Sequence, residues 1–214
     1  ARLATIDLFD REARHQCHRV STSLEYAQSY QQCLNDCDAI LIIAPETDDI
    51  LAGLTQGALE QGKSILGCQP NAIRVASNKY DCYQQLHNCH IPAVKTILAT
   101  QWPNHVFTNL AGDVLKPLNG AGCLDTYHFK TKAALEQFLT TYDVTALNNA
   151  IIQPYLDGIS ASLSLLANNN EIEVLAINQQ HITQSGTQLK LAACTINDLD
   201  SIPFTIEQAQ QLAT

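Results

Sequence analysis

Over the first 72 residues, segments whose hydrophobic positions have the spacing of a β-strand alternate with segments that have the spacing of a helix. Residues 38–44 form an almost uninterrupted apolar run of strand length, which predicts a parallel strand buried on both faces. Shorter apolar segments at 3–9 and 64–68 predict two further strands. Apolar residues at helical spacing predict helices over residues 24–34 and 50–58. The alternation predicts a Rossmann-like unit, without the glycine fingerprint of dinucleotide sites.

Residues with capping chemistry mark the ends of the predicted helices. Asp48 and Asp49 are expected to cap the second helix, and Gly62 is expected to end it. Ser77 is a candidate N-cap for a third helix, which would carry an aromatic face. Pro92 then predicts extended backbone, because the residue before a proline avoids the helical region.

The second half of the chain reads mainly as strands. The segments with strand-like runs or alternation are 114–116, 150–153, 160–166, 172–177 and 188–195. An asparagine-rich turn between the third and fourth of these predicts an antiparallel hairpin. Helices are expected after Thr131 and from Thr205, where Thr205 and Gln208 have the spacing of a capping box.

Composition limits the classes of partner. The chain has 214 residues, of which 46% are hydrophobic and 15% charged, and its net charge is −9. This charge argues against nucleic acid and against anionic membrane surfaces as partners. The sequence has no apolar run long enough to span a membrane and no signal-peptide pattern, so we expect a cytoplasmic protein. Its eight cysteines lack the regular spacing of a disulfide scaffold and are expected to be reduced.

The run from Val114 to Cys123 has the chemistry of a phosphate site. It places Lys116 at the end of an apolar strand, followed by a short loop that contains Gly120 and Gly122. Glycines allow backbone N–H groups to approach phosphates, and a lysine supplies a compact positive charge. Arginine is absent after Arg74, so a polyanion bound by the rest of the chain must rely on lysines, backbone amides and metal ions.

Two further segments extend this pattern. Lys79 lies upstream of the glycine loop, and an apolar hinge at 151–158 lies downstream. A glycine loop alone is often only a turn, but the three features in this order predict ATP binding. Cys123 is expected to be structural rather than a nucleophile, because no His/Asp partner can be identified for it. His181 is expected either to line the substrate pocket or to belong to a polar cluster at the sheet end.

The order and spacing of these motifs resemble the ATP-grasp superfamily of carboxylate–amine ligases. The matching segments are SNKYDCYQQLHNCHIPAVKT (77–96), DVLKPLNGAGCLDTY (113–127), IIQPYLDGISASLSLL (151–166) and LAINQQHI (175–182). Within the superfamily they resemble the tyramine–glutamate ligase group of methanofuran biosynthesis and its relatives in methylotrophic bacteria. The resemblance implies an α/β ATP-grasp fold, with a Rossmann-like pre-ATP-grasp domain over 1–76 and an ATP-grasp domain over 77–214.

The resemblance also implies a set of ATP-binding residues. Two lysines would contact the phosphates, the loop 119–123 would close over them as a mobile lid, and the hinge would read the adenine edge with backbone groups. Asp157 or Ser160 would reach the ribose, although many relatives carry a glutamate where Ser160 stands. The residues so assigned are Lys79, Lys116, Gly120, Ala121, Gly122, Gln153, Pro154, Tyr155, Leu156 and Ser160.

The implied reaction is ATP-dependent amide formation. A substrate carboxylate attacks the γ-phosphate, and an amine then displaces phosphate from the resulting acylphosphate. The expected cofactors are ATP and Mg²⁺, and the expected substrates are a carboxylic acid, plausibly glutamate, and an amine. A homodimer is one candidate assembly, and the sequence does not determine the oligomeric state. Positioning and electrostatics carry most of such catalysis, and we assign no catalytic residue.

The magnesium ligands of the family are not matched in this sequence. They comprise an acidic residue and a Glu two positions before an Asn, near the C-terminal end of the domain. After Thr195 the acidic residues are Asp198, Asp200 and Glu207, and none begins a Glu-x-Asn pattern. We therefore assign no metal ligand and expect the C-terminal part of the domain to be incomplete. The chain also lacks methionine, and the hypothesis of missing methionines or segments predicts an intact mass that differs from this sequence.

Two alternatives to a ligase remain open at this point. The first is a nucleotide-binding protein that has lost catalysis. The second is a Cys/His metal-binding module, because ligand-type residues cluster in three places, 15–18, 33–37 and 82–90. A zinc site commonly uses paired Cys units, and Cys33-x₃-Cys37 has no second matching unit. Small buried cysteines and surface histidines are the simpler interpretation.

Overall fold

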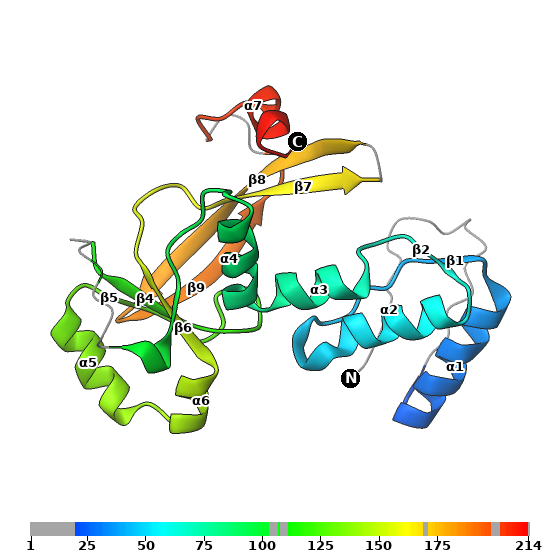
Figure 1. Ribbon diagram of the computed structural model, residues 1–214, viewed down its shortest axis with the longest axis horizontal. Coiled ribbons are helices and arrows are strands. Elements are labelled where there is room, and N and C mark those ends of the chain that lie inside the picture. The colour runs from blue at the N-terminus through cyan, green and yellow to red at the C-terminus, as the bar shows by residue number, and fades with distance from the viewer. Residues whose placement is uncertain (1–19, 103–106, 108–110, 169–170, 198–201, 214) are drawn as a thin grey trace. The chain divides into compact units, whose positions relative to one another are not determined.

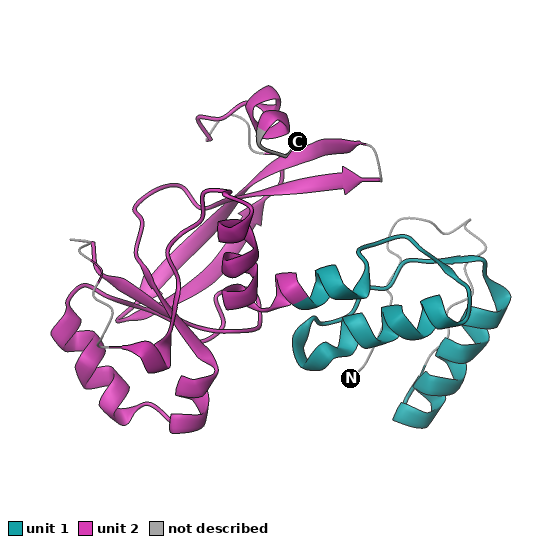
Figure 2. Cartoon of the chain, viewed as in Figure 1, with its two compact units in different colours: residues 1–74 teal, residues 75–214 magenta. Residues whose placement is uncertain are grey.

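The chain forms two compact units, residues 1–74 and 75–214 (Figure 2). The computed structural model describes residues 20–102, 107, 111–168, 171–197 and 202–213. The predicted strand at 3–9 and the Cys/His cluster at 15–18 lie outside the described residues, so the Rossmann-like character of the first unit stays a prediction. No described helix has both the length and the apolar character needed to span a membrane.

The described part of the first unit combines helices with a short parallel ladder. Its elements are α1 (Ser23–Asp36), β1 (Ala39–Ile40), the 3₁₀ turn η1 (Thr47–Asp49), α2 (Ile50–Glu60), β2 (Ser64–Ile65) and the first part of α3 (Pro70–Ser77). Both predicted helices are confirmed. The N-cap of α1 is Thr22, whose Oγ1 accepts a hydrogen bond from the N–H of Glu25, and Leu34 of α1 is fully buried.

The predicted strand at 38–44 is much shorter than expected. Only Ala39 and Ile40 pair, with Ser64 and Ile65 of β2 in parallel register. Within the described part of this unit, β2 is the one strand paired with β1, so there is no wide sheet with two covered faces. Ile43 is 82% exposed, and the expectation of burial on both faces was therefore wrong.

Asp48 and Asp49 do not cap α2 through their side chains. Both adopt left-handed backbone conformations, with φ of 57° and 58°, and no side-chain cap is formed on α2. The Asp49 carboxylate instead accepts hydrogen bonds from Arg74, at 2.8 Å from Nε and 3.0 Å from Nη2, and these bonds hold the pKa of Asp49 below its usual range. Gly62 follows the helix at φ +73° and donates to Leu59, as predicted for its end.

The described residues of the second unit form an antiparallel sheet of seven strands, whose arrangement can be followed in Figure 1. Its strands are β3 (Ile97–Leu98), β4 (Asp113–Pro117), β5 (Thr126–Phe129), β6 (Ala150–Pro154), β7 (Ala161–Ala167), β8 (Ile172–Ser185) and β9 (Gln188–Thr195). Their spatial order is β3-β6-β4-β5-β9-β8-β7. The predicted hairpin is formed by β7 and β8, and the predicted strands at 114–116, 150–153 and 188–195 are also confirmed. β3 and β5 were not predicted.

Two apolar clusters support this sheet. The larger cluster joins the buried faces of β4 and β6 to α5 (Lys132–Thr141) through Leu115, Ile152 and Leu135. The smaller cluster joins Val174 and Ile177 of β8 to Ala209 of α7 (Ile206–Ala213). A short helix, α6 (Val144–Asn148), lies between α5 and β6 in the chain.

The caps predicted for two helices of this unit are confirmed. Thr131 Oγ1 accepts a hydrogen bond from the N–H of Ala134 at 3.2 Å, at the start of α5. Thr205 and Gln208 exchange reciprocal hydrogen bonds of 2.9 and 3.2 Å, which form the predicted capping box before α7.

The cap of α4 (Lys79–Asn88) differs from the prediction by one residue. Ser77 is the last residue of α3, and Asn78 is the N-cap of α4. Asn78 Oδ1 accepts from the N–H groups of Tyr80 and Asp81, at 3.0 and 3.2 Å. An asparagine side chain caps as well as a serine, so the local sequence favoured neither.

Candidate functional site

A cavity of about 850 Å³ opens beside the sheet of the second unit. It is bounded by the start of α4, the end of β4, the glycine loop, the segment after β6 and one stretch of β8. All ten predicted ATP-binding residues line it: Lys79, Lys116, Gly120, Ala121, Gly122, Gln153, Pro154, Tyr155, Leu156 and Ser160. Residues from four parts of the sequence therefore meet at one cavity.

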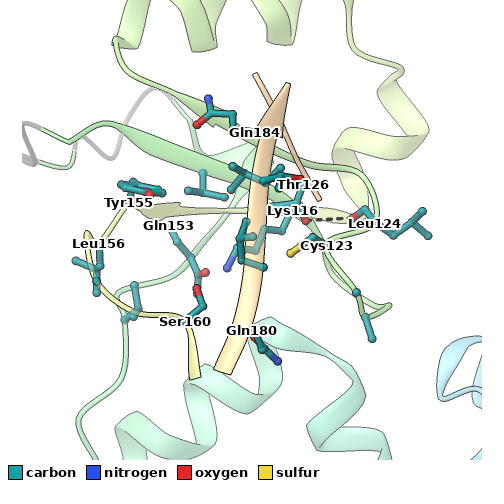
Figure 3. A pocket seen from close by; sticks show the side chains of 18 of the residues that line it. Lys116, Cys123, Leu124, Thr126, Gln153, Tyr155, Leu156, Ser160, Gln180 and Gln184 are labelled. Carbon is teal, nitrogen blue, oxygen red and sulfur yellow. Dashed lines mark hydrogen bonds between the residues drawn. The ribbon is translucent and has the colours of Figure 1, made fainter. Parts of the chain in front are cut away.

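Figure 3 shows how the labelled side chains are arranged around Lys116. Tyr155 and Leu156 lie on one side of this lysine in the view, and Cys123 and Leu124 lie on the other. Lys116 belongs to β4, where it pairs with Ile151 of β6. The cavity thus has a hinge side and a glycine-loop side, with a cationic group between them.

Lys79 is tied to the glycine loop by hydrogen bonds. Its ammonium Nζ donates to the carbonyl oxygen of Gly120 at 2.8 Å and, at the limit of hydrogen-bond distance, to that of Leu118 at 3.5 Å. Its backbone N–H donates to Leu118 as well, at 2.9 Å. The start of α4 and the loop after β4 are therefore held together, although the bonded residues are 39 and 41 positions apart in sequence.

Burial lowers the pKa of both lysines. For Lys79 the main cause is loss of hydration, and the nearby charge of Lys116 lowers its pKa further. For Lys116 loss of hydration again dominates, and Cys123 acts in the opposite direction. Among the described residues that line the cavity there is no Asp or Glu. Two poorly hydrated cations without a carboxylate partner favour an anionic ligand.

The glycine loop has a backbone that suits close approach of a ligand. Gly120 and Gly122 have φ of +95° and +68°, values that side chains disfavour, and a Cβ at either position would meet no atom within 4 Å. Cys123 and Asp125 also have positive φ, of 58° and 45°. The backbone conformation therefore favours glycine at both positions, and the space next to each Cα is open.

Among residues 153–156 of the hinge, one N–H group is available. Gln153 pairs with Val114 in the sheet, Pro154 has no N–H, and the N–H of Tyr155 donates to Gly112 at 2.8 Å. Across the described chain, no protein acceptor takes the N–H of Leu156. Of the four hinge residues predicted to read the adenine edge, Leu156 is thus the one with a backbone donor to spare.

The two candidates for ribose contact differ in position. Ser160 lines the cavity, and its carbonyl oxygen accepts from the N–H of Gln180 in β8 at 2.8 Å. Asp157 is not among the lining residues. The geometry thus favours Ser160 over Asp157, and its contact with a ribose remains a prediction.

His181 and Cys123 both line the cavity. His181 Nε2 lies 2.7 Å from Thr195 Oγ1 of β9, so this histidine has a polar partner on the sheet. Its place in a substrate pocket stays a prediction. Cys123 is a free thiol in the described structure.

One structural residue next to the site was missed by sequence reasoning. His128 of β5 is buried, and its ring stacks on the ring of Tyr155 with a centroid separation of 3.9 Å. Nothing in the local sequence around His128 signals this contact. It arises because β4 pairs with β5 on one side and with β6 on the other, which brings the ends of β5 and β6 close together.

The described residues give little support for a metal-binding site. The residues that the structure describes contain no group of three or more His, Cys, Asp or Glu side chains able to hold a metal ion. The segments 33–37 and 82–90 therefore do not assemble into a zinc-type site there. The cavity lining also offers no carboxylate for Mg²⁺, so its residues do not fit a protein-bound magnesium ion by themselves.

An antiparallel sheet, a glycine loop and two lysines around an acid-free cavity make the second unit an α/β domain with a site suited to an anionic ligand. Sequence comparison supports a specific family. The pattern of the ATP-grasp domain matches residues 76–211, and that of the pre ATP-grasp 3 domain matches residues 5–73. The chain belongs to the ATP-grasp family.

Two curated proteins of known name are similar to most of this chain. A tyramine–L-glutamate ligase from Methanocaldococcus fervens is 28% identical over 149 residues, which cover 70% of this chain and 40% of that protein. A tyramine–L-glutamate ligase from Methanocaldococcus jannaschii is 29% identical over 149 residues, 70% of this chain and 38% of that protein. The chain spans about two fifths of the length of these relatives. The resemblance found in the motifs is confirmed.

Solved structures show the same fold. An ATP-grasp superfamily protein from Archaeoglobus fulgidus matches with a TM-score of 0.60 and 24% identity, over 87% of this chain and 52% of that chain. The D-alanine–D-alanine ligase from Coxiella burnetii matches with a TM-score of 0.56 and 16% identity, over 83% of this chain and 50% of that chain. The predicted α/β ATP-grasp fold is confirmed.

Proposed function

We propose that the full-length protein is an ATP-dependent carboxylate–amine ligase that binds ATP in the cavity of the second unit. The observation that supports it best is the convergence of Lys79, Lys116, the glycine loop and the hinge on one acid-free cavity. These residues come from distant parts of the sequence: the lysines and the glycine loop have the chemistry expected for the triphosphate, and the hinge has the chemistry expected for the base.

The proposed placement follows from these groups. The triphosphate would lie near the ammonium groups of Lys79 and Lys116, beneath the open backbone of the glycine loop. The adenine edge would accept a hydrogen bond from the N–H of Leu156, and Tyr155 would offer an apolar face. The ribose would lie toward Ser160.

The proposed reaction has two steps. A carboxylate oxygen of the acid attacks the γ-phosphorus, the bond to the β,γ-bridging oxygen breaks, and ADP leaves. The amine nitrogen then attacks the acyl carbon, phosphate leaves, and the nitrogen loses a proton to give the amide. The chain's contribution is to hold the phosphates in place and to offset their negative charge with two lysines. Magnesium bound to the phosphates would supply further charge neutralisation.

The proposed acid is glutamate. The support is the similarity to two tyramine–L-glutamate ligases, each matched over about two fifths of its length. The amine is left open, and a role in methanofuran biosynthesis stays a prediction. Small-molecule substrates rather than a macromolecule also fit the net charge of −9, which disfavours nucleic acid.

A second candidate is a nucleotide-binding protein without ligase activity. The observation that favours it is the lack of Asp and Glu among the described cavity-lining residues. Phosphoryl transfer with metal ions generally uses carboxylate ligands, so such a cavity could bind a nucleotide without activating it.

Calorimetric titration of the full-length protein with Mg-ATP tests the proposal. The test variant is Lys116→Ala, and the control is Lys130→Ala, which removes an exposed lysine that does not line the cavity. We expect Lys116→Ala to weaken ATP binding about tenfold or more, since it removes a charged hydrogen-bond donor to phosphate. Lys130→Ala is expected to bind as the wild type does.

Phosphate release then separates the two candidates. Release from ATP that requires both glutamate and an amine supports the ligase. Tight ATP binding without phosphate release, whichever acid and amine are added, supports the nucleotide-binding protein without ligase activity. Equal ATP affinity in the wild type and Lys116→Ala would refute the assignment of the cavity.

A further inference from the structure

A buried histidine lies directly behind the hinge. His128 is 6% exposed and does not line the cavity. Its ring stacks on that of Tyr155, with centroids 3.9 Å apart and planes inclined by 15°. Tyr155 does line the cavity, so His128 is separated by one aromatic ring from the space proposed for the nucleoside.

The orientation of the His128 ring is fixed by protein groups around it. Nε2 lies 2.8 Å from the carbonyl oxygen of Ala111, and Nδ1 lies 3.5 Å from Oε1 of Gln184. The Gln184 amide is itself oriented, because its Nε2 donates to Gly186 at 2.9 Å. The backbone N–H of His128 donates to Thr187 at 2.7 Å. Rotation of the imidazole would break the shorter of these contacts and the stack.

Two of the residues that contact His128, Tyr155 and Gln184, lie in different parts of the cavity wall. Tyr155 is on the hinge side, and its backbone is held by Gly112. Gln184, on β8, also lines the cavity (Figure 3). His128 therefore touches the hinge and the β8 wall at once, from a position that the ligand itself cannot reach.

We propose that His128 is a positioning residue for the nucleoside part of ATP, which acts by holding the ring of Tyr155 in place through the stack. The inference rests on the proposed function and deepens it. Without the imidazole, Tyr155 loses the ring that stacks on it. The apolar contact with the base and the adjacent N–H of Leu156 are then less well placed. The lysines and the glycine loop, which hold the phosphates, are unaffected.

The experiment compares two ligands that share the triphosphate. Full-length wild type, His128→Leu and His128→Phe are titrated calorimetrically with ATP and with inorganic tripolyphosphate, each with Mg²⁺. Both substitutions remove the two ring nitrogens, but only phenylalanine keeps an aromatic ring against Tyr155. The control is His87→Ala, which breaks a His–Tyr contact with Tyr83 on α4, away from the cavity lining.

A nucleoside-specific loss is the expected result. Loss of one stacked aromatic pair should weaken ATP binding about tenfold in His128→Leu, and by less than about threefold in His128→Phe. Affinity for tripolyphosphate should stay within about twofold in both variants, and His87→Ala should match the wild type.

Other outcomes overturn the inference. Equal ATP affinities of the leucine and phenylalanine variants, or equal losses of ATP and tripolyphosphate, would mean that His128 has no specific role toward the nucleoside. A wild type that binds tripolyphosphate and ATP, with His128→Leu unchanged, refutes this inference but leaves the proposed function standing. A wild type that binds neither ligand refutes both.

A measurement on the wild type covers the case in which His128→Leu does not fold. The NMR signal of the His128 ring is assigned as the one absent from the spectrum of His128→Phe. We expect ATP to shift this signal through the Tyr155 ring, and tripolyphosphate to leave it in place. A signal that ATP does not move would overturn the proposal.

Discussion

At the scale of single residues, the two lysines of the cavity make ATP affinity dependent on pH. The pKa of each is lowered by burial, so each loses its proton at a lower pH than the usual value of about 10.4. Since the protonated forms attract phosphate, affinity should fall as pH rises through the lowered pKa values. Above each pKa the loss should approach about tenfold per pH unit for that lysine.

Calorimetry with ATP from pH 7 to 11 measures this dependence. Lys116→Arg is the informative comparison, because a guanidinium stays protonated throughout and should flatten the profile. An affinity that is constant up to pH 11 in the wild type would contradict the prediction.

Gly112 is a position where no side chain fits. Its φ is +95°, and an added Cβ would clash with the carbonyl oxygen of Phe129 and lie 2.9 Å from Cα of Lys130. We expect Gly112→Ala to lower the free energy of unfolding by about 3 kcal/mol, through backbone strain and overpacking.

Urea denaturation followed by the fluorescence of Trp102 measures this change, since Trp102 is the single tryptophan and packs against the larger apolar cluster. Gly158→Ala is the matched control, because nothing lies within 4 Å of its added Cβ, and it should change stability by less than about 1 kcal/mol. Similar stabilities of the two variants would show that β4 and β5 can separate locally.

At the scale of elements, the N-cap of α4 controls the first turn that carries Lys79. Asn78→Ala removes the acceptor for the N–H groups of Tyr80 and Asp81 and should cost about 1 kcal/mol of helix stability. Hydrogen exchange at these two amides should become about fivefold faster. Asn78→Asp keeps an acceptor and should exchange as the wild type does. Unchanged exchange in Asn78→Ala would show that tertiary contacts, not the cap, hold this turn.

Elements with strong local signals could be predicted from the sequence. The helices after Thr131 and Thr205 have clear caps and regular apolar spacing, and the β7–β8 hairpin has alternation on both sides of a turn. The strand prediction was wrong where pairing with other strands, rather than local sequence, determines the structure. Residues 38–44 have strand composition, yet only two of them pair with other described residues, because pairing depends on strands elsewhere in the unit.

More of the residues of the candidate site than of the elements around it could be named from the sequence. Lys116, the glycine loop and the hinge stand in motifs, so their side chains could be named before their positions were known. His128 could not be named, because β5 has four residues and no distinctive pattern. Its importance depends on strand register, which places it against Tyr155.

At the scale of the whole molecule, the lining of the cavity lies entirely within the second unit, from Lys79 to Leu189. We propose a domain boundary after residue 76, and we expect a fragment of residues 77–214 to fold alone, because both apolar clusters are contained in it. It should unfold cooperatively in urea by Trp102 fluorescence and retain ATP binding. A fragment without a cooperative transition would show that the second unit depends on the first.

The acid-free cavity also has a consequence for the kinetics of binding. The chain as a whole carries a net charge of −9, whereas the described cavity lining holds only neutral and cationic side chains. An approaching anion is therefore repelled at long range and attracted only within about 10 Å, the screening length at 0.1 M salt. Rising ionic strength should weaken the repulsion and leave the association rate of ATP unchanged or faster, while dissociation accelerates. In such a molecule, tight binding of ATP requires a long residence time, because the repulsion slows its arrival.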